Sequence, residues 1–111
     1  MTSPPDKWHQ REVDTARQII DEATRALQQG RIDVGEQTLQ EADAILDMTG
    51  SDDDEVVELR SKLYNQIGVS LQQRGEAEDA RTWHERAAEL GEELIERESE
   101  VRGHTAATYL N

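Results

Sequence analysis

Side chains that could do catalytic or metal chemistry are few in this sequence and lie far apart along it. The three histidines are His9, His84 and His104. None belongs to a His-Glu-x-x-His pattern, and a zinc site needs three or four converging ligands, for which these spacings give no basis. The seven glycines are scattered, so they form no glycine-rich loop for a phosphate. We therefore expect no metal site, no cofactor and no enzymatic activity.

The acidic run after Gly50 is the densest group of possible metal ligands. Ser51 precedes four consecutive acidic residues, which end at Glu55. These carboxylates crowd into one helical turn and lack the alternating ligands of a cation-binding loop. The hydroxyl of Ser51 at a helix N-terminus can accept from unpaired backbone N–H groups, and the carboxylates meet the positive end of the helix dipole. The run therefore predicts a helix start rather than a metal site.

Composition excludes several classes of protein. The 111 residues include 25 acidic and 12 basic ones, which gives a formal net charge of −13, and there is no cysteine. Nucleic acid is an unfavourable partner, because phosphate binding needs clustered Lys and Arg. No apolar run approaches the roughly 18 residues of a membrane span, and the first ten residues lack the apolar core of a signal peptide. We expect one small cytoplasmic domain that does not bind membranes.

The distribution of charge is also informative. Carboxylates are dispersed along the whole chain, and ten of the twelve basic residues are arginine. This pattern looks like proteins from salt-loving archaea, where dispersed carboxylates keep the surface hydrated. An ordinary acidic bacterial or archaeal protein is the alternative.

Apolar residues recur at helical spacing throughout, and no window alternates with the period of a strand. The chain is therefore expected to be all-α. Helices are predicted from Pro5 or Asp6 to a cap at Gly30, from a cap at Asp33 to Gly50, from the acidic run to Arg74, and from Glu76 to about Val101. Gly103 is expected to end the fourth helix, and Thr105 to cap a fifth. This divides the chain into a flexible tail (1–5), a first hairpin (6–50), a second hairpin (51–103) and the start of a third or a capping segment (104–111).

The two hairpins are similar at an offset of 45 residues. Gly30 aligns with Gly75, and small residues recur at equivalent positions on both helices, as in the pairs Ala23 and Gly68, Gly35 and Ala80, and Ala42 and Ala87. Recurrent small residues indicate repeated close approaches of helix backbones, which an arbitrary bundle does not need.

The second hairpin resembles a tetratricopeptide repeat (TPR). The resemblance is carried by Tyr64, Ile67, Gly68 and Leu71 in its first helix, Gly75 at the turn, and Ala80, His84 and Ala87 in its second helix. Leu71 and His84 replace the usual aromatics, and Glu92 stands where the family has proline. The 45-residue spacing is more similar to the longer repeats of kinesin light chains than to the 34-residue kind. The resemblance implies a right-handed solenoid fragment in which Gly68 faces Ala80. An unrelated helical bundle is the alternative.

The resemblance also implies a function, the binding of a peptide or partner helix in a concave groove lined by the first helix of each hairpin. The implied groove positions are Arg17, Ile20, Thr24 and Leu27, and then Lys62, Asn65, Val69 and Gln72. Arg17 and Lys62 could receive a peptide carboxylate, or they could pair with nearby acidic groups. Ile20 and Leu27 also belong to the inward apolar stripe, so only one of their two uses can dominate.

Self-association is the alternative function. The predicted fourth helix is longer than the third, which leaves apolar residues near its end without a cover inside the hairpin. Two copies could cover each other about a two-fold axis. The residues expected in such a homodimer are Leu94, Ile95, Val101, Tyr109 and Leu110.

Overall fold

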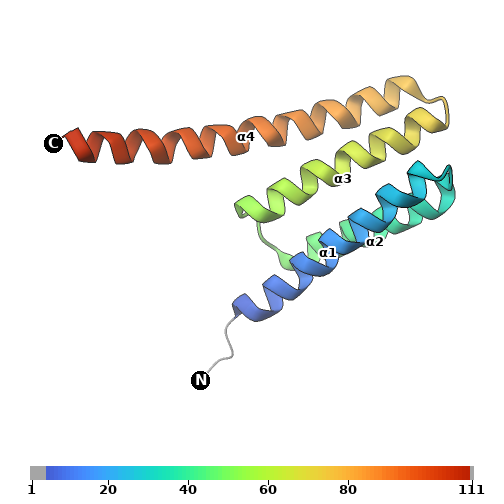
Figure 1. Ribbon diagram of the computed structural model, residues 1–111, viewed down its shortest axis with the longest axis horizontal. Coiled ribbons are helices and arrows are strands. Elements are labelled where there is room, and N and C mark those ends of the chain that lie inside the picture. The colour runs from blue at the N-terminus through green and yellow to red at the C-terminus, as the bar shows by residue number, and fades with distance from the viewer. Residues whose placement is uncertain (1–4, 111) are drawn as a thin grey trace.

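The computed structural model describes the backbone of residues 5–110 and the side chains of residues 9–100, and this part of the chain contains four helices and no strand (Figure 1). The helices are α1 (Pro5–Gln28), α2 (Ile32–Thr49), α3 (Asp54–Gln73) and α4 (Ala77–Leu110). The prediction of an all-α fold is confirmed. No described helix is both long enough and apolar enough to cross a membrane.

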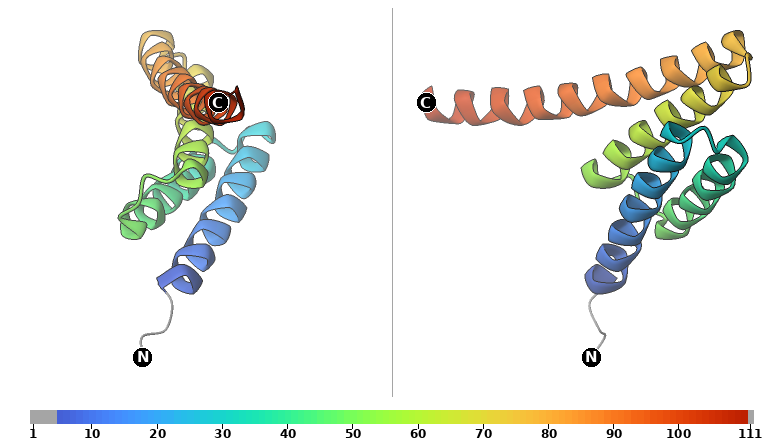
Figure 2. Two further views of the ribbon diagram at one scale, coloured as in Figure 1. Left: turned by 90° about the vertical axis from the view of Figure 1, so that its left-hand side faces the viewer. Right: turned by 45° about the vertical axis from the view of Figure 1, so that its right-hand side comes forward.

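The helices form two antiparallel hairpins, α1 with α2 and α3 with α4, and α3 lies between the first hairpin and α4 (Figures 1 and 2). Among the described helices, α4 packs against α3 alone. The main core therefore belongs to α1, α2 and α3. Its buried members are Val13, Ala16, Ile20, Ala23, Leu27, Leu39, Ala42, Leu46, Val56, Leu59 and Leu63. Among the side chains of α4 that the structure describes, the fully buried ones are the small Ala80 and Ala87, which let its backbone come close to α3.

The turns of the two hairpins have the same geometry, 45 residues apart. Gly30 and Gly75 have positive φ angles of 77° and 83°, a conformation that glycine adopts without a Cβ penalty. Each donates its N–H to the carbonyl three residues before it, at 3.0 Å in both cases. The next residue in each turn, Arg31 or Glu76, donates to the carbonyl five residues before it. With these two hydrogen bonds, each of the helices α1 and α3 ends in a Schellman-type motif. The predicted role of the two glycines as helix ends is confirmed.

The acidic run starts α3 as predicted, but the capping side chain is Asp53 rather than the hydroxyl of Ser51. Asp53 is the N-cap residue, and its Oδ1 accepts from the backbone N–H of Val56 at 3.0 Å. Ser51 supports the cap, because its Oγ accepts from the N–H of Asp53 at 3.2 Å. The acidic run is therefore a helix start.

The predicted cap of α2 at Asp33 is wrong. The helix begins at Ile32, directly after the turn, with Arg31 at the N-cap and no side-chain capping bond. Asp33 already lies inside the first turn, and its carboxylate accepts instead from Arg74 at 2.6 Å. The tight turn brings the chain into the helix one residue before the predicted cap.

The predicted break at Gly103 and the predicted new helix from Thr105 are also wrong, because α4 runs without interruption to Leu110. A single glycine inside a helix costs only about 1 kcal/mol relative to alanine, and neither a turn nor a proline follows it here. Arg97 of α4 reaches Asp54, the first residue of α3. The rest of α4 extends past α3 by about 20 Å at a rise of roughly 1.5 Å per residue (Figures 1 and 2).

Gly68 contacts a different residue from the one expected. A Cβ at this position would have the ring of His84 as its nearest neighbour, with Cε1 at 2.6 Å, rather than the methyl group of Ala80. The imidazole is held over Gly68 by Asn65, 3.1 Å from Nδ1, and by Gln72, 3.4 Å from Nε2. In the first hairpin the close approach is made by Gly35, where a Cβ would lie 2.6 Å from Cδ2 of Leu27.

Candidate functional site

Two of the predicted groove residues lie in the core and cannot line a groove. Ile20 is 3% exposed and Leu27 is 1% exposed, and both pack in the cluster formed by α1, α2 and α3. Both residues serve in the inward apolar stripe of α1, because burial of a large aliphatic side chain contributes about 1.5–3 kcal/mol to the stability of the fold. The prediction that these two residues contact a peptide is therefore wrong.

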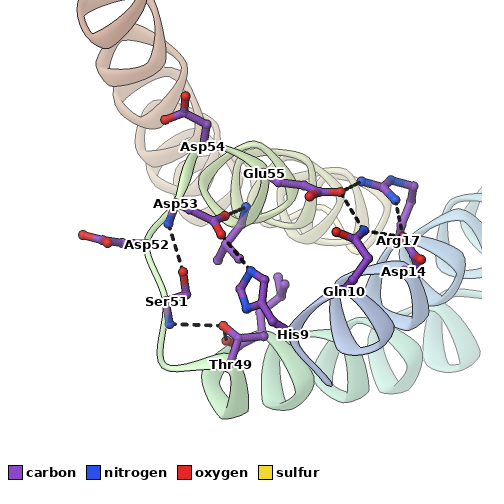
Figure 3. A network of polar contacts seen from close by, with 12 residues as sticks. His9, Gln10, Asp14, Arg17, Thr49, Ser51, Asp52, Asp53, Asp54 and Glu55 are labelled. Atoms are coloured by element: carbon purple, nitrogen blue, oxygen red, sulfur yellow. Dashed lines mark hydrogen bonds and ion pairs between the residues drawn. The ribbon is translucent and has the colours of Figure 1, made fainter. Parts of the chain in front are cut away.

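The two cations expected to receive a peptide carboxylate, Arg17 and Lys62, already have carboxylate partners, and those of Arg17 are shown in Figure 3. Arg17 donates from Nη2 to Oε1 of Glu55 at 2.5 Å and from Nη1 to Oδ1 of Asp14 at 3.0 Å. The hydrogen bond to Glu55 raises the pKa of Arg17 above its ordinary value. Lys62 lies 3.7 Å from Oε1 of Glu58, one turn earlier on α3. An entering carboxylate would have to compete with these groups.

The other four predicted groove residues are at least partly accessible. Thr24 is half-buried, and its hydroxyl donates to the carbonyl of Ile20 at 2.9 Å. Val69 is half-buried against the core, whereas Asn65 and Gln72 are exposed. The structure brings Asn65 and Gln72 together around the imidazole of His84, a contact that the sequence did not indicate.

A second polar contact joins the beginning of α1 to the beginning of α3. His9 lies in α1 with its Nε2 2.7 Å from Oδ2 of Asp53 (Figure 3). The N–H of Val56 is the main group that lowers the pKa of Asp53, and the contact with His9 lowers it further. The cluster fixes the helix start of α3 against α1, so its role is structural. Among the side chains that the structure describes, no group of three His, Asp or Glu residues could hold a metal ion.

A groove of about 330 Å³ lies between α2 and α4, and α3 forms its floor. We call it the α2–α4 groove. Its apolar lining consists of Leu39 from α2, Ile67 and Leu71 from α3, and Trp83 from α4. Glu36 and Asp43, one on each side of Leu39 in α2, supply carboxylates at its edge. The sequence pattern indicates Ile67 and Leu71 as positions of the repeat motif but does not predict the groove, because apolar spacing within one helix does not show where two helices diverge.

Arginines of α3 bind the carboxylates of α2 at both ends of this groove. Arg74 donates to Glu36 and Asp33, each at 2.6 Å from its Nη2, and these bonds raise its pKa. At the other end Arg60 donates to Asp47 at 3.0 Å, while its distance to Asp43 is 3.9 Å.

Asp43, at the edge of the groove, has a raised pKa although Arg60 is near it. Burial is the largest cause of the raised pKa of Asp43, and the neighbouring charge of Asp47 raises it further. Arg60 lowers this pKa but does not cancel the two other effects. The edge of the groove near Asp43 is therefore a favourable place for an additional positive charge.

Trp83 presents an aromatic surface to the groove. Its ring packs edge-on against Tyr64, with centroids 5.3 Å apart and planes at 65°. The guanidinium of Arg86 lies 4.7 Å from the centre of the Trp83 ring. These neighbours hold the indole in place while it stays half-buried, an arrangement that is common among aromatic residues that anchor protein contacts.

Two of the residues expected to mediate self-association are described. Leu94 is half-buried and Ile95 is 64% exposed, both on α4. The side chains of Val101, Tyr109 and Leu110 lie outside the described residues.

Comparison of the chain with family models, with curated proteins and with solved structures found no match. The TPR resemblance therefore depends on the quoted residues alone.

Proposed function

We propose that this chain is a non-catalytic interaction module of TPR-like stacked hairpins that binds a peptide or helix of another protein. The observation that carries the proposal is the equivalence of the two turns, in which the bonds made at Gly30 recur at Gly75 45 residues later. Chains built from equivalent hairpins expose long surfaces on both sides of the stack, and such surfaces suit extended or helical ligands.

Two surfaces of the described chain are available for this role. One is the side on which the resemblance places a concave groove, here called the concave side, with Thr24, Asn65, Val69 and Gln72 as its accessible predicted residues. The other is the α2–α4 groove, which adds an apolar floor and an aromatic ring. A cytoplasmic location, expected from the sequence, is part of the same proposal.

The proposal is tested with an array of peptides that vary in charge and in amphipathic pattern. We expect a subset to bind saturably, as measured by the fluorescence anisotropy of labelled peptides in solution. Circular dichroism of the same sample verifies that the protein is helical. If the folded protein binds no peptide saturably at millimolar concentrations, the proposed function is wrong.

The alternative function is self-association, and the exposure of Ile95, on the part of α4 that lies near the beginning of α3, favours it. The double variant Leu94→Glu plus Ile95→Lys leaves the net charge unchanged, so any change in mass reports the loss of apolar contact. We expect light scattering in high salt to give a dimer for the unmodified chain and a monomer for the variant. Equal monomeric masses would eliminate this alternative.

A further inference from the structure

The α2–α4 groove is an apolar surface in the described part of the chain that no other helix covers. Both α2 and α4 pack on α3, but within the described residues they do not contact each other. The floor between them is therefore open along the helix direction. Its volume of about 330 Å³ is at the lower end of the range for ligand pockets, roughly 300–1,000 Å³. An open groove of this size suits a row of side chains from a helix better than an enclosed small molecule.

The charges around the groove define which helix would fit. Four carboxylates of α2, at positions 33, 36, 43 and 47, face two guanidinium groups of α3, Arg60 and Arg74. Carboxylates are therefore in excess along this edge, and the whole chain has a net charge of −13. At the end of the edge near Asp43, burial and the charge of Asp47 raise the pKa of the Asp43 carboxyl, although Arg60 lies 3.9 Å away and acts in the opposite direction. Such an edge attracts cationic side chains and repels anionic ones.

We propose that the α2–α4 groove binds a cationic amphipathic helix of another protein. Apolar side chains of this helix contact the half-buried Ile67 and Leu71 and cover the exposed face of Trp83, and its Lys or Arg residues lie beside Glu36 and Asp43. The inference deepens the proposed function and rests on it. A second copy of this chain fits poorly, because residues 92–100 of α4 contain five glutamates and a single arginine, which would face the carboxylates of α2.

The probe is a pair of synthetic peptides of about 15 residues, long enough for about four helical turns. One has leucines along one face and lysines on the other, and its partner has glutamate in place of every lysine. The protein is used as the Trp8→Phe variant, because Trp83 is then its only tryptophan. We expect the lysine peptide to bind saturably and to shift the emission of Trp83 to shorter wavelength as water leaves the indole. We expect the glutamate peptide to do neither.

Two variants of α2 separate groove binding from general attraction to an acidic protein. Gln40 lines the groove, and Gln40→Lys places one positive charge there. Glu41 is exposed and does not line the groove, and Glu41→Lys changes the net charge by two. For groove binding we expect Gln40→Lys to weaken the lysine peptide about threefold to tenfold and Glu41→Lys by less than about twofold. General attraction predicts the opposite order, because Glu41→Lys removes more negative charge.

A variant of the concave side separates failure of this inference from failure of the proposed function. Asn65 is exposed on α3, outside the groove, so Asn65→Lys should leave binding of the lysine peptide unchanged. If Asn65→Lys weakens binding and Gln40→Lys does not, the peptide lies on the concave side, which overturns the inference and leaves the proposed function intact. An unchanged Trp83 emission at saturation, or equal affinity for the glutamate peptide, also overturns it. If the folded chain binds neither these peptides nor any in the array, both proposals are wrong.

Discussion

Replacing Gly35 with alanine is expected to destabilise the first hairpin, because the new methyl group has no space. Its Cβ would lie 2.6 Å from Cδ2 and 2.7 Å from Cγ of Leu27, whereas carbon atoms in optimal contact are about 3.5–4.0 Å apart. One helix or the Leu27 side chain must therefore move by about 1 Å. Leu27 is 1% exposed and has no route into solvent. Overpacking of this kind costs about 1–3 kcal/mol, and the helix propensity of alanine returns up to about 1 kcal/mol.

The net expectation is a loss of about 1–2 kcal/mol in the free energy of unfolding, measured by urea denaturation followed by circular dichroism. Gly91→Ala is the matched control, because no atom lies within 4 Å of a Cβ at that position of α4. It should gain up to about 1 kcal/mol from helix propensity alone. Gly68→Ala should fall between the two, since the half-buried His84 ring can rotate away at the cost of its hydrogen bonds. If Gly35→Ala and Gly91→Ala are equally stable, α1 and α2 do not pack as described.

Three further outcomes are expected. The pKa of Asp53 is lowered in the folded state, so its capping contribution to stability is complete above the unfolded pKa of about 3.9 and is lost as the pH falls through the folded pKa. In urea denaturation across this range, the free energy of unfolding of Asp53→Asn should therefore depend less on pH than that of the unmodified chain. Asp53→Ala should lose about 1 kcal/mol of stability at neutral pH. With a net charge of −13, the melting temperature should rise between 0.01 M and 1 M salt as the screening length falls from about 30 Å to 3 Å, and a melting curve indifferent to salt would contradict the role given to self-repulsion. The pair formed by Arg17 and Glu55 is partly exposed, so a double-mutant cycle should give a coupling of about 0.2–1 kcal/mol, and a coupling of several kcal/mol would contradict this description of the pair.

The sequence predicted the helices well because the signals for them are local. The apolar spacing on α1 and the glycines at the two hairpin turns act within one or two turns of helix, and all of them have the predicted roles. The errors occurred where a local signal was weak. Asp33 has a side chain that can cap a helix, but α2 already begins one residue earlier, directly after the turn. Gly103 does not end α4, because no turn follows this glycine.

The candidate site was less predictable because it depends on how helices diverge. Periodicity shows which face of α1 is apolar, and this correctly marked Ile20 and Leu27 as core residues, but the resemblance assigned the same residues to a groove. Whether a half-buried residue such as Ile67 contacts another helix or lines an open groove depends on the separation of α2 from α4. No spacing within one helix encodes that separation. A tryptophan among apolar positions, as at Trp83, was the only local signal near the groove.

The contacts of the arginines support the proposal that the partner is cationic. Arg17 links α1 to α3, Arg60 links α3 to α2, and Arg97 links α4 to the start of α3 through Asp54 and the carbonyl of Asp52. These guanidinium groups already donate to oxygen atoms of neighbouring elements, so an anionic ligand would have to break contacts between helices in order to bind them. A cationic ligand has no such cost, because it adds charge where carboxylates are in excess. The same few arginines that hold the helices together therefore leave the surface suited to positively charged partners.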